Sequence, residues 1–423
     1  MNYSPVIYEA YQAYADLTKP ISSAAKATAP FLDIEWPWIP ELVTTKNIRA
    51  ACEIIALARL THERIPFAIG SITVGEQTSM VTEEVALETP FCSLLHLKKE
   101  RAAPQPRVLL LAPMSGHFAT LLRGTARTLL RDHDVYVTDW HNVRDTPLAD
   151  GTFGVDEYID HIIRFVETIG EGTHLVAVCQ PAVAAIVATA LMAEDDNPIQ
   201  PASMTLMAGP IDCRVNPTEV NHLAISKPYE WFKQNLIAKV PLRYNGAGRR
   251  VYPGFMQISA FMSMNLDRHV SSFRDFYNYM VSGDSEKAET VKLFYDEYFA
   301  VMDLPADFYL ETIRSIFQEY HLPRGVFQYR GRTVHPAAIR RTPLFTVEGE
   351  KDDICSIGQT LAAQDICSGL PPYMKQHHMQ AGVGHYGVFN GRRWENEIYP
   401  RLRDFIHASE SLGLSPVPTP IAA

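Results

Sequence analysis

The sequence lacks the features that nucleic-acid-binding and membrane-spanning proteins need. Its 423 residues carry 38 Lys and Arg against 48 Asp and Glu, a formal net charge of −10, and basic residues cluster only in short pairs such as Arg249-Arg250. A nucleic-acid partner is not expected, because contact with the phosphate backbone needs a basic patch. No window approaches the roughly 20 apolar residues of a membrane-spanning helix, so no span is expected. The net charge also argues against electrostatic docking on anionic lipid.

Export signals, metal motifs and nucleotide motifs are missing as well. Residues 1–20 lack the basic start and continuous apolar core of a signal peptide, and the six cysteines are scattered without a CxxC pair. We therefore expect a bacterial cytosol in which thiols stay reduced and a free thiol can act as a nucleophile. There is no GxxxxGK[ST] loop, and the GxG within residues 246–254 follows no clear strand. His377, His378 and Cys367 match no standard metal spacing, so neither cofactor nor metal is expected.

Apolar runs alternate with amphipathic segments through the middle of the chain. The runs cover residues 107–117, 133–142, 174–180 and 202–212, and helical patterns lie between them. Continuous apolar strands alternating with helices predict a parallel sheet covered on both faces. Right-handed crossovers would place the carboxyl ends of these strands on one edge, where the sites of α/β proteins form. The strand pattern resumes at residues 342–353 and 374–389.

The remaining segments predict additions around this α/β core. Residues 1–65 read as a helical arm interrupted by a Pro-rich stretch whose Trp36 and Trp38 we expect to pack the arm onto the body. Residues 66–98 read as short antiparallel strands. An insertion rich in aromatic residues and Met lies between two strands, the usual position of a lid. The expected division is an arm (1–65), a core (66–213 and 341–412), a helical lid (214–340) and a flexible tail (413–423); the oligomeric state is not indicated.

The segment THLVAVCQPAVAAIVATAL, residues 173–191, carries the first candidate for chemistry. A serine hydrolase places G-x-S-x-G at such a strand-to-helix junction, whereas this chain has Ala177-Val178-Cys179-Gln180-Pro181. Ala177 has the next smallest side chain after glycine, and Pro181 falls at the first helical position, where its fixed φ helps and its missing N–H costs nothing. Cys179 is thus either a nucleophile on a modified turn or an ordinary buried thiol.

Two further groups follow predicted strands in the order that α/β-hydrolases use. After Cys179 come Asp352, with Asp353 beside it, and then His385 in the glycine-rich GVGHYGVFNG. Nucleophile, acid and histidine in this chain order predict a thiol that attacks a carbonyl, a histidine that carries the proton and a carboxylate that orients the imidazole. The alternative for either Asp is a turn or helix cap.

An oxyanion hole would need two backbone donors near the nucleophile. Gln180, directly after Cys179, supplies one N–H. The second is expected from the loop APMSGHFATLLRG, near Met114 or Ser115. The simpler reading of that loop is a plain strand-to-helix connection in which Ser115 caps the next helix.

Several of these segments together resemble intracellular poly(3-hydroxybutyrate) depolymerases, which belong to the α/β-hydrolase superfamily. The matching segments are VCQPA, GPID, VEGEKDDI, GVGHYGVFNGRRW, APMSGHFATLLRGT and VTDWHNVRD. Within this resemblance Cys179 corresponds to the nucleophile, Asp352 to the triad acid and His385 to the base. Cys355, in DDICS near the proposed acid, has no role that the resemblance explains.

The resemblance implies a cytoplasmic bacterial enzyme that binds the surface of stored polyester granules and hydrolyses the polymer to 3-hydroxybutyrate oligomers and monomer. A thioester on Cys179 could also pass its acyl group to coenzyme A, a second expected partner. Two rival readings remain. One is a polyhydroxyalkanoate synthase-like acyltransferase, whose elbow resembles G-x-C-x-G; the other is a non-catalytic granule protein on a hydrolase fold.

Overall fold

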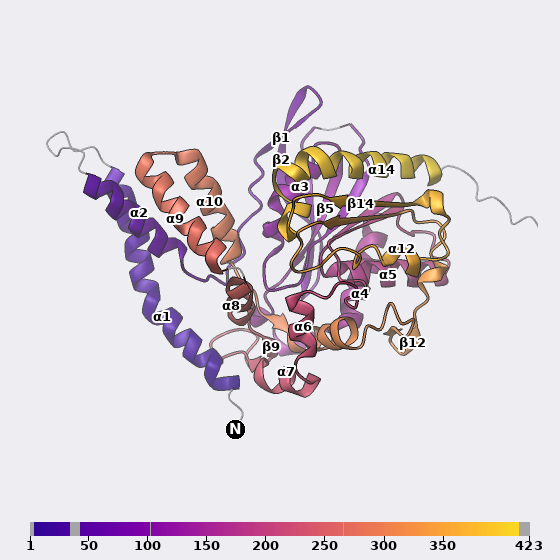
Figure 1. The fold of residues 1–423 in the computed structure, drawn as a ribbon, viewed down its shortest axis with the longest axis horizontal. Coiled ribbons are helices and arrows are strands. Elements are labelled where there is room, and N and C mark those ends of the chain that lie inside the picture. The colour runs from indigo at the N-terminus through magenta and orange to yellow at the C-terminus, as the bar shows by residue number, and fades with distance from the viewer. Residues whose placement is uncertain (1–3, 34–42, 102, 265, 414–423) are drawn as a thin grey trace, which may run out of the picture.

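A nine-stranded sheet forms the centre of the protein, as seen in a computed structural model that describes residues 4–33, 43–101, 103–264 and 266–413 (Figure 1). The strands lie in the order β1-β2-β3-β5-β4-β6-β7-β13-β14, antiparallel from β1 to β5 and parallel from β5 to β14. They are β1 Ser71–Val74, β2 Gln77–Glu88, β3 Cys92–Lys99, β4 Arg107–Leu111, β5 Asp134–Trp140, β6 Thr173–Val178, β7 Ser203–Met207, β13 Leu344–Gly349 and β14 Lys375–Gln380.

Helices cover both faces of the parallel strands, which explains their continuous apolar sequences. Along β4, Val108 and Leu110 enter one hydrophobic core while Leu109 and Leu111 enter the other. In Figure 1, α3 and α14 lie on one side of the sheet and α4 and α5 on the other. These helices are α3 Arg123–Leu129, α4 Val155–Ile169, α5 Pro181–Glu194 and α14 Tyr399–Gly413. The predicted α/β-hydrolase fold is confirmed.

The reversed order of β5 and β4 creates a topological switch point in the sheet. Chain order continues outward from β4 through β6, β7, β13 and β14, so the loops after these strands share one edge. Ligands of open α/β sheets bind in the crevice beyond the carboxyl ends of the strands at such a point. The turns and short helices beside the sheet are η2 Ala119–Leu122, η3 Val143–Asp145, η4 Leu148–Asp150, α12 Ala363–Ile366, η7 Pro372–Met374, η8 His385–Val388, α13 Gly391–Arg393 and η9 Trp394–Ile398.

The segment between β7 and β13 is mainly helical but also holds short strands that the sequence did not predict. Strands of two or three residues are too short to show an alternation of apolar and polar residues. Here they form a small sheet in the order β10-β9-β8 and a hairpin of β11 with β12. The elements are α6 Glu219–Ile225, α7 Tyr229–Asn235, β8 Ala238–Lys239, β9 Arg250–Tyr252, α8 Gly254–Met264, α9 Leu266–Ser282, α10 Ser285–Tyr298, β10 Leu304–Pro305, α11 Ala306–Thr312, η5 Ile313–Gln318, β11 Gln328–Tyr329, β12 Arg332–Thr333 and η6 Pro336–Ala338.

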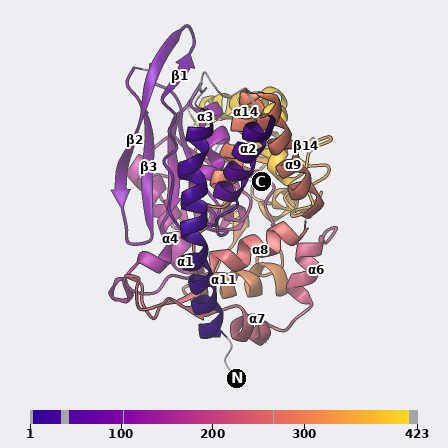
Figure 2. The same ribbon diagram turned by 90° about the vertical axis from the view of Figure 1, so that its left-hand side faces the viewer.

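The N-terminal helices lie against the inserted segment. In Figures 1 and 2, α1 (Ser4–Thr28) runs along the outside of the molecule and α2 (Val43–Leu57) lies beside α9, with η1 (Ala29–Asp33) following α1. Tyr8 is fully buried and its hydroxyl donates to the carboxylate of Asp303, itself fully buried. Trp36, Trp38 and the tail from residue 414 lie outside the described residues. None of the described helices combines the length and apolarity needed to cross a membrane.

Candidate active site

Cys179 sits on a sharp turn between β6 and α5. Its φ is +65°, in the left-handed region that a residue with a Cβ occupies only at a cost of about 1–2 kcal/mol. The turn is held by two backbone bonds, because the Cys179 N–H donates to the Met207 carbonyl at 2.8 Å and the Cys179 carbonyl accepts from Ala182 at 3.1 Å. The helix begins at Pro181, its first residue. The geometry is that of a strained strand-to-helix elbow, which presents one side chain above the edge of the sheet.

A glycine in a neighbouring segment takes part in this turn, and sequence reasoning overlooked it. A Cβ on Gly209, two residues beyond β7, would lie 2.2 Å from the Ala182 Cβ and 3.3 Å from the Cys179 carbonyl oxygen. The start of α5 can therefore approach the end of β7 only because residue 209 has no side chain. A glycine two residues after a buried strand was the available signal, since glycine beside a strand often marks close backbone approach.

Asp352 and His385 form a buried hydrogen-bonded pair at the ends of β13 and β14. The Nδ1 of His385 lies 2.8 Å from Asp352 Oδ2 and 3.1 Å from Oδ1. Asp352 Oδ1 also accepts from the amides of Ile354 (2.9 Å) and Cys355 (2.8 Å), which fix the carboxylate. The neighbouring Asp353 is exposed. The structure thus brings Asp352, rather than Asp353, to the histidine.

The electrostatics of His385 link it to Cys179 as well as to Asp352. Burial by itself would lower the pKa of His385, but the charges of Asp352 and Cys179 and the hydrogen bonds to both side chains hold that pKa well above its usual range. Since Nδ1 faces Asp352, Nε2 is the nitrogen left to face the thiol. An imidazole placed between a carboxylate and a sulfur, as His385 is between Asp352 and Cys179, can transfer a proton to and from a reacting group.

The expected oxyanion donors lie close to one another. The amide N–H of Met114 points to the side-chain oxygen of Gln180 at 3.3 Å, a long bond that a better acceptor would displace. Within the described part of the chain, no acceptor is found for the main-chain N–H of Gln180. Ser115 is half-buried in the same loop, and η2 begins after Phe118 without a side-chain cap. The alternative reading of Ser115 as the cap of the next helix is therefore wrong.

The inserted segment is joined to this oxyanion loop through His117. The backbone of His117 pairs with Val301, and the Gly116 carbonyl accepts from the Met302 amide at 2.9 Å. The buried His117 ring stacks on Phe261 and Tyr298, with ring centroids 6.0 and 5.1 Å away. Burial lowers the pKa of His117 to about 4, so the ring is neutral at pH 7. These contacts tie the loop that carries Met114 and Ser115 to the inserted segment.

A cavity of about 550 Å³ opens between α8, α9 and α10 of the insertion and the edge of the sheet. His385 lies in its wall, whereas Cys179, which is half-buried, does not. An ion pair spans the two sides of this cavity, since Arg123 of α3 lies 2.7 Å from Glu297 of α10. Burial raises the pKa of Glu297 to about 7, although Arg123 opposes the shift. The other residues of the wall are mostly aromatic and aliphatic: Phe261, Met264, Val291, Leu293, Phe294, Tyr295, Tyr298, Ile354 and Tyr386.

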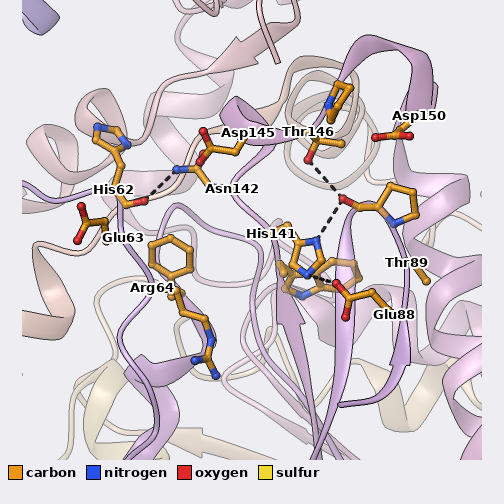
Figure 3. Close-up of a pocket in the computed structure, with 14 residues that line it drawn as sticks. His62, Glu63, Arg64, Glu88, Thr89, His141, Asn142, Asp145, Thr146 and Asp150 are labelled. Atoms are coloured by element: carbon orange, nitrogen blue, oxygen red, sulfur yellow. Dashed lines mark hydrogen bonds and ion pairs between the residues drawn. The ribbon is translucent and has the colours of Figure 1, made fainter. Parts of the chain in front are cut away.

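A larger cavity, of about 810 Å³, lies elsewhere, and none of the predicted site residues line it. Figure 3 shows its polar wall, in which His141 and Thr146 both donate to the Pro90 carbonyl. Trp140 contributes to the same wall, and the adjacent Asp139 pairs with Arg64. Trp140 at the end of β5 and His141 directly after it therefore border the larger cavity rather than the one that contains His385.

The other cysteines differ from Cys179 in exposure. Cys92, Cys213, Cys355 and Cys367 are buried, and only Cys52 shares the intermediate exposure of Cys179. Burial raises the pKa of the Cys355 thiol well above its usual range, as does the neighbouring charge of Asp352. The thiol of Cys355 is therefore protonated at neutral pH, while its amide supports Asp352. Among the described residues, no three His, Cys, Asp or Glu side chains are grouped so as to hold a metal ion.

The strand order, the elbow at Cys179 and the acid and histidine at later strand ends define a hydrolase of the α/β type. Residues 208–410 match the family model described as "PHB de-polymerase C-terminus", which confirms the resemblance to these depolymerases over that part of the chain. The protein is accordingly a carboxylic ester hydrolase. The matched region contains Asp352 and His385 but begins after Cys179.

Solved structures align with this chain only at low similarity. An epoxide hydrolase from Bacillus megaterium aligns with a TM-score of 0.43 and 13% identity over 76% of this chain and 99% of its own. A thermophilic esterase from Thermogutta terrifontis aligns with a TM-score of 0.40 and 14% identity over 78% of this chain and 99% of its own. Likenesses this weak say nothing about the reaction. No curated protein matches the chain significantly.

Proposed function

We propose that this protein hydrolyses the ester bonds of poly(3-hydroxybutyrate), with Cys179 as nucleophile, His385 as general acid and base, and Asp352 as the group that orients the histidine. The observation that carries the proposal is the buried His385, hydrogen-bonded to Asp352 at 2.8 Å and to the side chain of Cys179. Its chemistry suits acyl transfer through a thioester. The family match supports a polyester as the substrate class.

The reaction runs in two balanced halves. The Cys179 sulfur, having given its proton to His385, adds to the ester carbonyl, and the amides of Gln180 and of Met114 or Ser115 receive the oxyanion. When this tetrahedral intermediate collapses, the bond between the carbonyl carbon and the ester oxygen breaks, and the His385 imidazolium gives its proton to the departing alkoxide. Water then adds to the thioester with His385 as base, which releases the acid and restores the thiol.

Proton transfer from His385 decides whether the tetrahedral intermediate goes on to the thioester or returns to the substrate. A thiolate is a better leaving group than an alkoxide, so an unprotonated intermediate would expel sulfur and return to substrate. The raised pKa of His385 favours the imidazolium at neutral pH, which makes alkoxide departure competitive. Asp352 contributes by holding the ring orientation and by favouring its charged form.

The substrate is proposed to enter as an extended, neutral and apolar chain. The aromatic and aliphatic wall of the 550 Å³ cavity suits such a chain, and this volume lies within the range of small-molecule sites. We propose that the enzyme acts in the cytoplasm at the surface of polyester granules, held there by apolar contacts rather than by charge. Coenzyme A is proposed as a second acyl acceptor, since a thioester exchanges readily with a thiol.

The central experiment incubates the protein with amorphous poly(3-hydroxybutyrate), with and without iodoacetamide, and measures released 3-hydroxybutyrate and its oligomers. Mass mapping is expected to show that inactivation follows alkylation of Cys179. Cys52→Ala is the matched control, because Cys52 is the other cysteine that is not buried. Full activity of Cys179→Ala would refute the mechanism. Polymer formation from 3-hydroxybutyryl-CoA would favour the synthase-like alternative, and acyl-CoA released when CoA is added would support thiolysis.

A further inference from the structure

One cation in the wall of the cavity beside His385 has no side-chain partner among the described residues. Arg268, on the first turns of α9, lines the same wall as His385. Within the part of the chain that the structure describes, its side chain makes no hydrogen bond or ion pair. The other charged groups of the wall are Arg123, which is paired with Glu297, and Asp353, which has an interaction of its own. The guanidinium is therefore the charge in this wall that is available to a ligand.

The charge of Arg268 reaches the catalytic side of the cavity. Burial raises the pKa of Tyr386, next to His385 in the chain; Arg268 acts in the opposite direction, and the smaller effect of Asp353 adds to the rise. Burial likewise raises the pKa of Tyr298 on α10, and Arg268 again opposes it. Both tyrosines line the same cavity, so the guanidinium acts on the space between the insertion and His385.

The chemistry of polyester cleavage fixes which part of the substrate occupies this space. When an ester bond of poly(3-hydroxybutyrate) breaks, the acyl part stays on sulfur and keeps the hydroxyl end of the chain. The leaving alcohol carries the carboxyl end. His385 protonates that alcohol, and His385 rather than Cys179 borders the cavity, so the leaving segment is the part that extends into it.

From this arrangement we propose that Arg268 binds the terminal carboxylate of the leaving segment and makes the enzyme prefer chains with a free carboxyl end. The inference rests on the proposed function. Arginine suits the role because its planar guanidinium binds a carboxylate through two parallel hydrogen bonds. The aromatic and aliphatic wall contacts the methyl-bearing repeat unit, and Arg268 binds the carboxylate at the end of the chain. Cleavage then proceeds from the carboxyl end of the polymer.

The test compares a short 3-hydroxybutyrate oligomer as the free acid with the same oligomer as its methyl ester. Wild-type kcat/KM is expected to favour the free acid by roughly 10- to 100-fold, the effect of a hydrogen bond to a charged group. Arg268→Gln is expected to remove this preference by lowering kcat/KM for the free acid while leaving the methyl ester within about twofold. Arg268→Lys retains part of the preference, because a point charge remains without the bidentate geometry. Arg274→Gln is the matched control, since Arg274 is exposed on the same helix outside the cavity.

The outcomes separate this inference from the proposed function. An equal loss for both substrates in Arg268→Gln, or no wild-type preference for the free acid, overturns the carboxylate site. Turnover of the methyl ester that iodoacetamide abolishes shows in the same assay that the esterase function stands. Absence of turnover for both substrates in the wild type refutes the proposed function itself. As a second readout, the wild-type preference should shrink as salt rises, because Arg268 is exposed to solvent.

Discussion

Replacing Gly209 with alanine should move the nucleophile without touching it. The new Cβ would start 2.2 Å from the Ala182 Cβ. Carbon atoms in contact prefer about 3.5–4.0 Å, so the start of α5 and the end of β7 must separate by roughly 1.3 Å or more. The Cys179 carbonyl, 3.3 Å from the same Cβ, is pushed in the same direction.

The expected cost divides between activity and stability. A displacement of about 1 Å in a reacting group can reduce turnover about 100-fold, and overpacking a dense core costs about 1–3 kcal/mol. Ester hydrolysis and the rate of Cys179 alkylation report the first effect, and the urea midpoint reports the second. The double variant Gly209→Ala/Ala182→Gly removes the clashing methyl group and should recover most of the turnover. Gly70→Ala is the control, because a Cβ at residue 70 meets nothing within 4 Å.

Two results would refute this reasoning. If Gly209→Ala hydrolyses ester at the wild-type rate, the elbow does not depend on the close approach of β7 and α5. If the double variant stays as inactive as the single one, the loss has a cause other than the Ala182 contact.

Three further predictions follow from charged groups and from the insertion. In Asp352→Asn, the basic limb of the pH–kcat/KM profile should move to lower pH, because the charge that raises the pKa of His385 is gone. Asp353→Asn should leave that limb in place. Equal shifts in the two variants would contradict the assignment of Asp352 as the acid. Glu297 has its pKa raised to about 7, so its contribution to stability is complete below its unfolded pKa of about 4.3 and is lost as pH rises through 7. Urea titrations of Glu297→Gln should therefore show a smaller fall in the free energy of unfolding between pH 5 and pH 8, by no more than about 3 kcal/mol, and an unchanged fall would exclude this origin. His117→Phe keeps the stacking on Tyr298 but loses the hydrogen bond between the His117 ring and the Tyr298 backbone. The rate of hydrolysis should fall roughly tenfold while Cys179 is alkylated at the normal rate. Equal losses in the rates of hydrolysis and alkylation would indicate general damage to the site.

The sequence predicts the core of this protein well, because burial determines the residue types within each single strand. Strands such as β4 and β6 are buried on both faces, so their residues must be apolar throughout, and that pattern is visible without a structure. Candidate site residues were found for the same reason, since Cys179 directly follows a recognisable strand and Asp352 and His385 lie in the loops that follow two others.

What the sequence could not predict involves segments that meet only in space. Adjacent acids such as Asp352 and Asp353 look equivalent until the path of the loop turns one of them toward His385. Gly209 and Ala182 approach each other from different strand–helix units. Arg268 looks like an ordinary exposed helix residue until α9 is placed over the edge of the sheet.

The pairing of Tyr8 with Asp303 has a consequence for the order in which the chain can fold. A partner 295 positions away does not exist when the first helix leaves the ribosome. At about 5–20 residues per second, the delay before Asp303 is made is roughly 15–60 s. During that interval α1 can already pack against α2, but the buried hydroxyl of Tyr8 has no carboxylate to receive its hydrogen bond, so the N-terminal turn of α1 reaches its final position only after Asp303 is in place.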